Sequence, residues 1–132
     1  MPRVLWPLRQ GRPSVQIILT LTPGGQTYPR TLLADTGAGP RNAVFELVLD
    51  HNDCLLCGGY LLQRVLLGGA YAGSFPIYII SVQVPALGIN MDLPAVGVPS
   101  VPIGFDGIAC FAFLNRFTYG NFGDPGQFGL EC

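Results

Sequence analysis

One carboxylate stands at the end of an apolar run and directly before a turn of small residues. Residues 31–34 are Thr-Leu-Leu-Ala, Asp35 follows them, and Thr36-Gly37-Ala38-Gly39 comes next. A strand of this kind would carry Asp35 to the edge of a hydrophobic core, and the small residues after it would leave the carboxylate reachable. Glycine lets backbone N–H groups approach an oxygen closely, and the threonine hydroxyl can bond a neighbour. The pattern predicts either a carboxylate placed for acid–base chemistry or an aspartate that caps a turn.

The other groups with ligand or nucleophile chemistry are four cysteines and one histidine. His51, Cys54 and Cys57 have a spacing that a metal ion could use, but a structural zinc site needs four ligands, usually in two pairs. Cys110 and Cys132 are isolated in the sequence. We therefore favour reduced structural thiols over a disulfide or a zinc site, and expect no metal and no cofactor. His51 lies among Asp50, Asn52 and Asp53, which predicts a histidine in a solvated loop.

The composition predicts one β-rich domain with more apolar surface than its charges can cover. The 132 residues are 49% apolar and 11% charged, where about 25% charged is ordinary. Part of this excess is expected in an interface between subunits or in an apolar substrate cleft. Eighteen glycines and twelve prolines favour turns and short strands over long helices. A formal net charge of −1 gives no reason to expect nucleic acid or an acidic membrane surface as a partner.

The sequence shows no targeting signal or membrane span. The apolar run at residues 4–6 is cut by Pro7, so it does not form the core of a signal peptide. No later apolar run has the length that crossing a bilayer requires. We expect a soluble, cytoplasmic protein without a membrane association.

The elements that must position Asp35 follow from hydrophobic periodicity and turn residues. Residues 14–22 and 27–34 are expected to form a hairpin that ends at Asp35, residues 43–49 fit either a strand or a short helix, and residues 50–59 look like a loop. Two apolar runs, 60–67 and 75–84, flank a glycine-rich tip at residues 68–74 and predict a long mobile hairpin. Residues 85–105 are rich in proline and glycine, 107–110 predict a short buried strand, 111–117 a helix and 117–131 a hairpin. The sum is an all-β fold, a small closed barrel with one short C-terminal helix.

This order of parts resembles the retropepsin-like aspartic proteases, the small homodimeric relatives of pepsin. The resemblance covers most of the chain and indicates a single domain over residues 1–132. It rests on the N-terminal strand with Trp6, the hairpin before Asp35-Thr36-Gly37-Ala38, the glycine-rich segment 68–73, and the strand–helix unit from Ile108 to Phe117. The resemblance places a flap at about residues 66–77 and an insertion-like region at about residues 40–67.

The resemblance implies an aspartic endopeptidase in which each subunit of a homodimer gives one Asp35 to a single site. Two close carboxylates share a proton, and together they activate the water that cleaves a peptide bond. The catalytic loop would be supported by Thr36, Gly37 and Ala38, with Thr36 bonding across the two-fold axis. The expected substrate is a polypeptide with hydrophobic residues near the cut. Its binding residues would be Gly39, Gly69, Ala70, Tyr71, Ala72, Gly73 and Ile108.

The sequence departs from the family pattern in three places. Cys110 stands where the family has glycine, and Gly39 and Phe111 replace an acidic residue and an arginine that form an ion pair in viral members. The stretch from residue 40 to 67 is longer than in viral members, so it could extend a pocket wall, dock a partner or block the cleft. These departures keep two alternatives open: a catalytically inactive binding or scaffolding module on the same fold, and an unrelated β-barrel in which Asp35 caps a turn.

Overall fold

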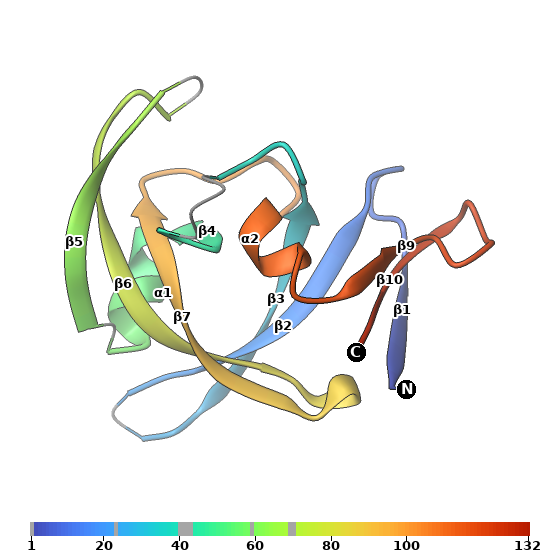
Figure 1. Cartoon of the computed structure of the whole chain (residues 1–132). Coiled ribbons are helices and arrows are strands. Elements are labelled where there is room, and N and C mark those ends of the chain that lie inside the picture. Colours follow the sequence, from blue (N-terminus) through green and yellow to red (C-terminus); the bar gives the residue numbers. More distant parts are fainter. Residues whose placement is uncertain (1, 23, 40–43, 59, 69–70) are drawn as a thin grey trace.

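The chain is mostly β-structure with a few short helices (Figure 1). The computed structural model describes residues 2–22, 24–39, 44–58, 60–68 and 71–132. The strands are β1 (Arg3–Pro7), β2 (Ser14–Thr20), β3 (Thr27–Ala34), β4 (Leu47–Asp50), β5 (Tyr60–Leu67), β6 (Gly73–Val84), β7 (Ile89–Val98), β8 (Gly107–Ala109), β9 (Thr118–Gly120) and β10 (Gln127–Glu131). The helices are α1 (His51–Leu56), α2 (Phe111–Leu114) and the 3₁₀ turn η2 (Pro85–Leu87).

Six strands close into a barrel, which confirms the predicted fold class. Their order is β2-β3-β8-β4-β7-β6, and β6 returns to β2 through Ile18 opposite Gln83 and Leu19 opposite Val82. Along β2 the buried side chains alternate with more exposed ones, as expected for a strand with one face on the core. Strand β5 is not part of this closed ring. It pairs with β6, and the β5–β6 hairpin projects from the barrel (Figure 1).

A smaller sheet brings the two ends of the chain together. β10 lies between β1 and β9, and both pairings are antiparallel. Trp6 from β1 and Leu130 from β10 are buried in the barrel core, so this sheet is packed on the barrel. The N- and C-termini are neighbours on one side of the molecule (Figure 1).

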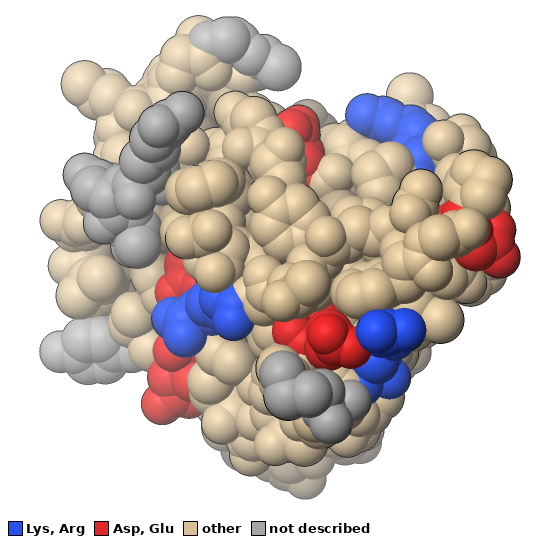
Figure 2. Space-filling view, turned by 45° about the vertical axis from the view of Figure 1, so that its right-hand side comes forward, with Lys and Arg blue, Asp and Glu red and all other residues tan. Residues whose placement is uncertain are grey.

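The buried apolar side chains form two clusters. The larger one fills the barrel, and the smaller one lies beneath the β5–β6 hairpin. The fully or nearly buried members of the smaller cluster are Phe45, Val48, Ile77, Val96, Val98, Ile108 and Cys110. On the outer surface, charged side chains of both signs stand in small separate groups on a mostly uncharged face (Figure 2). No helix in the described ranges is long and apolar enough to span a bilayer.

Several local predictions were right, and residues 50–59 were predicted wrongly. The hairpin before Asp35, the short strand at 107–109 and the helix beginning at Phe111 are all present, and the ambiguous run 43–49 becomes β4 from Leu47 onward. The predicted loop contains helix α1 instead, because Asp50 caps it by accepting the Asn52 N–H at 2.8 Å. His51 is half-buried rather than solvated, and its Nε2 lies 2.9 Å from the Tyr78 hydroxyl.

The proline-rich stretch after residue 85 also forms more regular structure than its composition indicates. It contains the ten-residue strand β7, which pairs with β6 on one edge and β4 on the other. Pro94 lies within this strand, and its carbonyl oxygen accepts a hydrogen bond from the Glu46 N–H at 2.8 Å.

The buried carboxylate of Glu46, just before β4, forms an ion pair with Arg116, which follows α2. Glu46 is only 3% exposed, and Arg116 donates to both of its carboxylate oxygens at 2.6 and 2.8 Å. The Glu46 carbonyl oxygen also accepts the Cys110 N–H at 3.0 Å. Bidentate geometry of this kind is the strong form of an arginine–carboxylate pair.

We expect Arg116→Ala to destabilise the protein by about 1–3 kcal/mol, because it leaves the Glu46 carboxylate buried without its partner. The matched control is Arg3→Ala. Arg3 pairs with Glu131, and the side chains of Arg3 and Arg116 are both 46% exposed. The two carboxylate partners differ, because the Glu131 side chain is 20% exposed and the Glu46 side chain is 4% exposed. The control should cost about 1 kcal/mol or less. Urea unfolding at one fixed protein concentration measures both, and equal losses would contradict the structural role of Glu46.

Candidate functional site

Backbone hydrogen bonds fix Asp35 at the end of β3. Its N–H donates to the Ala109 carbonyl at 3.0 Å, and its carboxylate accepts the Gly37 N–H at 2.9 Å. The Asp35 carbonyl accepts the Ala38 N–H at 3.1 Å, which closes the turn. Asp35 is half-buried, whereas Thr36 and Gly37 are exposed. The carboxylate is therefore held in one place and still reachable, as the sequence predicts.

The turn after Asp35 is joined to the strand–helix unit β8–α2. β3 and β8 run parallel, with Ala34 opposite Ala109. The Phe111 N–H at the start of α2 donates to the Ala38 carbonyl at 3.0 Å. The Thr36 hydroxyl points to no hydrogen-bond partner within the described part of the chain, so it is available to another group.

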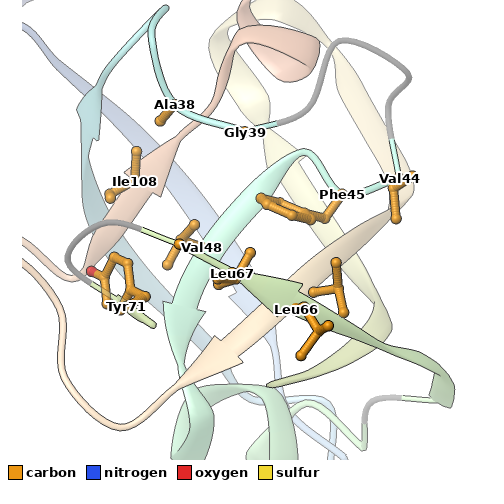
Figure 3. A pocket seen from close by; sticks show the side chains of 11 residues that line it. Ala38, Gly39, Val44, Phe45, Val48, Leu66, Leu67, Tyr71 and Ile108 are labelled. Atoms are coloured by element: carbon orange, nitrogen blue, oxygen red, sulfur yellow. The ribbon is translucent and has the colours of Figure 1, made fainter. Parts of the chain in front are cut away.

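An apolar cavity of about 480 Å³ lies between the Asp35 turn, β4 and the β5–β6 hairpin (Figure 3). Ala38 and Gly39 from the turn and Ile108 from β8 form one side of it. Tyr71 and the end of β5 form another side. None of the lining residues that the structure describes is charged; they are Ala38, Gly39, Val44, Phe45, Val48, Val65, Leu66, Leu67, Gly68, Tyr71 and Ile108. Such a cavity suits an apolar side chain of a ligand.

A second cavity, of about 330 Å³, contains Asp35 itself. Tyr71 and Ile108 border both cavities, so they stand between the apolar space and the carboxylate. Burial raises the pKa of the Tyr71 phenol above its ordinary value, with a smaller contribution from Cys110. The phenol is therefore a protonated hydrogen-bond donor at neutral and acid pH. The residues of this second cavity are Arg12, Leu33, Asp35, Tyr71, Ser100, Val101, Pro102 and Ile108.

Cys110, which stands where the family has glycine, is packed against Gly39. Gly39 has a φ of 79°, and a Cβ at this residue would lie 2.7 Å from Cys110 Cβ and 3.2 Å from its Sγ. The absence of a side chain at Gly39 is what makes room for Cys110. Burial, and then the charges of Asp35 and Glu46, raise the pKa of the Cys110 thiol to about 12. Cys110 is thus a neutral packing residue beside the carboxylate.

Five of the eleven predicted site residues line the two cavities. Asp35, Ala38, Gly39, Tyr71 and Ile108 line one or both cavities. Gly69 and Ala70 lie outside the described residues. Ala72 and Gly73 are exposed and line neither cavity.

The sequence left the role of residues 40–67 open and did not identify the residues that line the apolar cavity. Phe45, Val48, Val65 and Leu67 all line it, so the described part of this stretch extends a pocket wall, which was one of the three roles considered for it. The alternation of Val65 and Leu67 in β5 was the available signal. Arg12 was also missed, because nothing near it in the sequence connects it with Asp35.

No group of three or more metal-ligating side chains occurs among the residues that the structure describes. His51, Cys54 and Cys57 therefore do not converge as a metal site there. All four cysteines belong to the described residues, and each is free.

No known protein-family model matches the sequence, and no curated protein matches it either. The structure is similar to the crystal structure of a retropepsin-like aspartic protease from Rickettsia conorii. The match has a TM-score of 0.51 and 15% sequence identity, and it covers 90% of this chain and 92% of that one. At this identity the likeness shows the fold: the chain has a retropepsin-like fold.

The packing of Cys110 on Gly39 gives a reciprocal prediction. Gly39→Ala should destabilise the protein by more than about 1 kcal/mol, because the new methyl group overlaps Cys110 Cβ and because φ is positive. Cys110→Gly in the same chain should restore part of this loss by removing the overlap, whereas Cys110→Ala keeps the Cβ and should restore little. Thermal unfolding of the three single variants and the two double variants tests this coupling. Strictly additive losses in the Gly39→Ala, Cys110→Gly double variant would show that the two residues do not meet.

Proposed function

We propose that the protein is an aspartic endopeptidase whose active site forms between two copies of the chain, each giving one Asp35. The observation that carries the proposal is a fixed, reachable carboxylate in a cavity that opens beside an apolar one. In the cavity that holds Asp35, no other carboxylate lines the described walls. The chemistry needs a base and an acid, so the second carboxylate comes from the second subunit.

Two Asp35 carboxylates a few ångströms apart cannot both ionise easily, so the pair shares one proton. Aspartic proteases as a class are the standard example of this shared proton. The ionised member takes a proton from a bound water, and the resulting hydroxide attacks the peptide carbonyl. The protonated member polarises that carbonyl and later helps to protonate the leaving nitrogen.

The neighbours of Asp35 have supporting parts in this proposal. The Gly37 N–H keeps its hydrogen bond to the carboxylate and holds its orientation. The exposed Thr36 hydroxyl bonds to its counterpart across the two-fold axis and joins the two turns. Exposure of Thr36 and Gly37 in the single chain agrees with a surface that a second copy covers.

The β5–β6 hairpin serves as a flap in this proposal. Tyr71, just before β6, lines both cavities and would lie against the bound peptide. Closure of the hairpin excludes water and offers backbone hydrogen bonds to an extended chain. The uncharged cavity accepts a hydrophobic side chain at the cut.

One observation also fits a binding module without catalysis. The hydrogen bond from the Gly37 N–H to the Asp35 carboxylate is the contact that a turn-capping aspartate makes. Asp124 makes the same contact with the Gly126 N–H at 2.8 Å, on an exposed turn that lines neither cavity. Asp124 is therefore a matched control for the catalytic role of Asp35.

We expect Asp35→Asn to abolish cleavage of unfolded protein or apolar peptides while leaving the fold intact, because an amide cannot accept the proton from water. Asp124→Asn changes the same kind of turn and should leave cleavage unchanged. The measurement is the initial rate of peptide cleavage with equal amounts of folded protein, checked by circular dichroism.

The rate should show a bell-shaped dependence on pH with its maximum on the acid side, since the pair must carry one proton. Cleavage that persists in Asp35→Asn would contradict the proposal. A folded wild-type protein that cleaves nothing under acid conditions would favour the binding module.

A further inference from the structure

Arg12 differs from the other described arginines in making no side-chain hydrogen bond. The guanidinium groups of five others donate to a carboxylate, a carbonyl or a hydroxyl: Arg3, Arg9, Arg30, Arg64 and Arg116. Within the described residues Arg12 has no such partner, and its guanidinium lies over the Phe105 ring at 5.5 Å from the ring centre. Its donors are thus free while an aromatic ring helps to hold its position.

The backbone that carries Arg12 is held firmly on the rim of the site. Arg9 and Arg12 exchange two backbone hydrogen bonds, of 2.9 and 3.0 Å, around a tight turn. The turn is packed against Gly104, whose carbonyl accepts a hydrogen bond from the Arg9 side chain. The next residue, Pro13, accepts the Ala34 N–H at 3.0 Å and so ties the turn to the strand that delivers Asp35.

Arg12 lines the same cavity as Asp35. Among the described lining residues Arg12 is the one cation and Asp35 the one carboxylate, and no ion pair joins them. Ser100 lines the same cavity, and its hydroxyl has no hydrogen-bond partner in the described part of the chain. The remaining walls are apolar apart from the Tyr71 phenol. The cavity therefore offers the free donors of an unpaired guanidinium to a ligand that lies beside Asp35.

We propose that Arg12, assisted by Ser100, selects substrates with a glutamate or aspartate side chain close to the cleaved bond. The inference rests on the proposed function and adds the substrate class to it. A guanidinium binds a carboxylate through two parallel hydrogen bonds, which neither a glutamine nor an apolar side chain can match. The uncharged cavity on the other side of Tyr71 and Ile108 takes an apolar side chain of the same peptide. The preferred substrate carries both.

The test uses two series of peptides that share the same apolar pair of residues at the cleaved bond. One series carries a glutamate at a single flanking position and the other carries a glutamine there, and each nearby position is tried in turn. For the best position, the wild-type kcat/KM should be about tenfold higher for the glutamate peptide. Arg12→Gln should bring this ratio close to one, and Arg12→Lys should keep part of it. Arg3→Gln is the control, because Arg3 lines neither cavity, and it should leave the ratio unchanged.

The pH dependence supplies a second signature. The glutamate preference should fall as the pH is lowered through about 4.3, where glutamate becomes neutral and resembles glutamine. If Arg12 instead acted on Asp35, Arg12→Gln would shift the pH profile of both peptides equally without changing their ratio. That result would overturn the inference, as would a wild-type ratio of one at every flanking position.

Binding of the two fluorescein-labelled peptides to Asp35→Asn, measured by anisotropy, separates this inference from the proposed function. In the Asp35→Asn background the glutamate peptide should bind about tenfold more tightly than the glutamine peptide, and adding Arg12→Gln should abolish this difference. That result supports carboxylate recognition even if the wild type cleaves neither peptide. In that case only the peptidase proposal fails. Cleavage of both peptides with equal rates and equal binding would overturn the role of Arg12 and leave the peptidase intact. If Arg12→Gln does not fold, the wild-type ratio and its pH dependence still decide.

Discussion

The parallel pairing of β3 with β8 is the constraint on which the candidate site depends. It sets Leu32 opposite Gly107 and Ala34 opposite Ala109, so that the Asp35 N–H reaches the Ala109 carbonyl at 3.0 Å. β8 fits between β3 and β4 because Gly107 has no side chain: a Cβ there would lie 2.2 Å from the Val48 carbonyl oxygen. From this pairing follow the position of the carboxylate, the start of α2 and the contact between Gly39 and Cys110.

Two side chains that border both cavities divide the candidate site into two parts. Tyr71 and Ile108 separate a cavity whose described lining is apolar from one that is lined by Asp35 and Arg12. An apolar side chain gains most from leaving water in the first, whereas a carboxylate finds its donors in the second. One extended peptide can satisfy both only in a fixed direction and register, so the same geometry would position the bond to be cut. Selection and positioning would thus come from one arrangement.

Local patterns predicted the elements that present Asp35, because the alternation in residues 14–34 and the small residues after Asp35 act over short range. Helix α1 was not predicted, because its polar first turn, from His51 to Asp53, has the composition of a loop and because Asp50 was not recognised as a helix cap. The alternation of Val65 and Leu67 was a local signal for only part of the cavity wall. The meeting of this strand with Phe45 and Val48, and of Arg12 with Asp35, arises from contacts between distant segments, which no local pattern contains. Gly39 and Cys110 were each noted as departures from the family, but only their contact shows that one makes room for the other.

The most direct test of the proposed active site is the distance between the two Asp35 carboxylates in a crystal structure of the assembled protein. The proposed active site requires a two-fold dimer in which carboxylate oxygens of the two subunits lie within about 3 Å of each other, since they share a proton. The two Thr36 hydroxyls should meet across the same axis. Asp35 carboxylates separated by the width of the interface, or a dimer that buries neither turn, would contradict it.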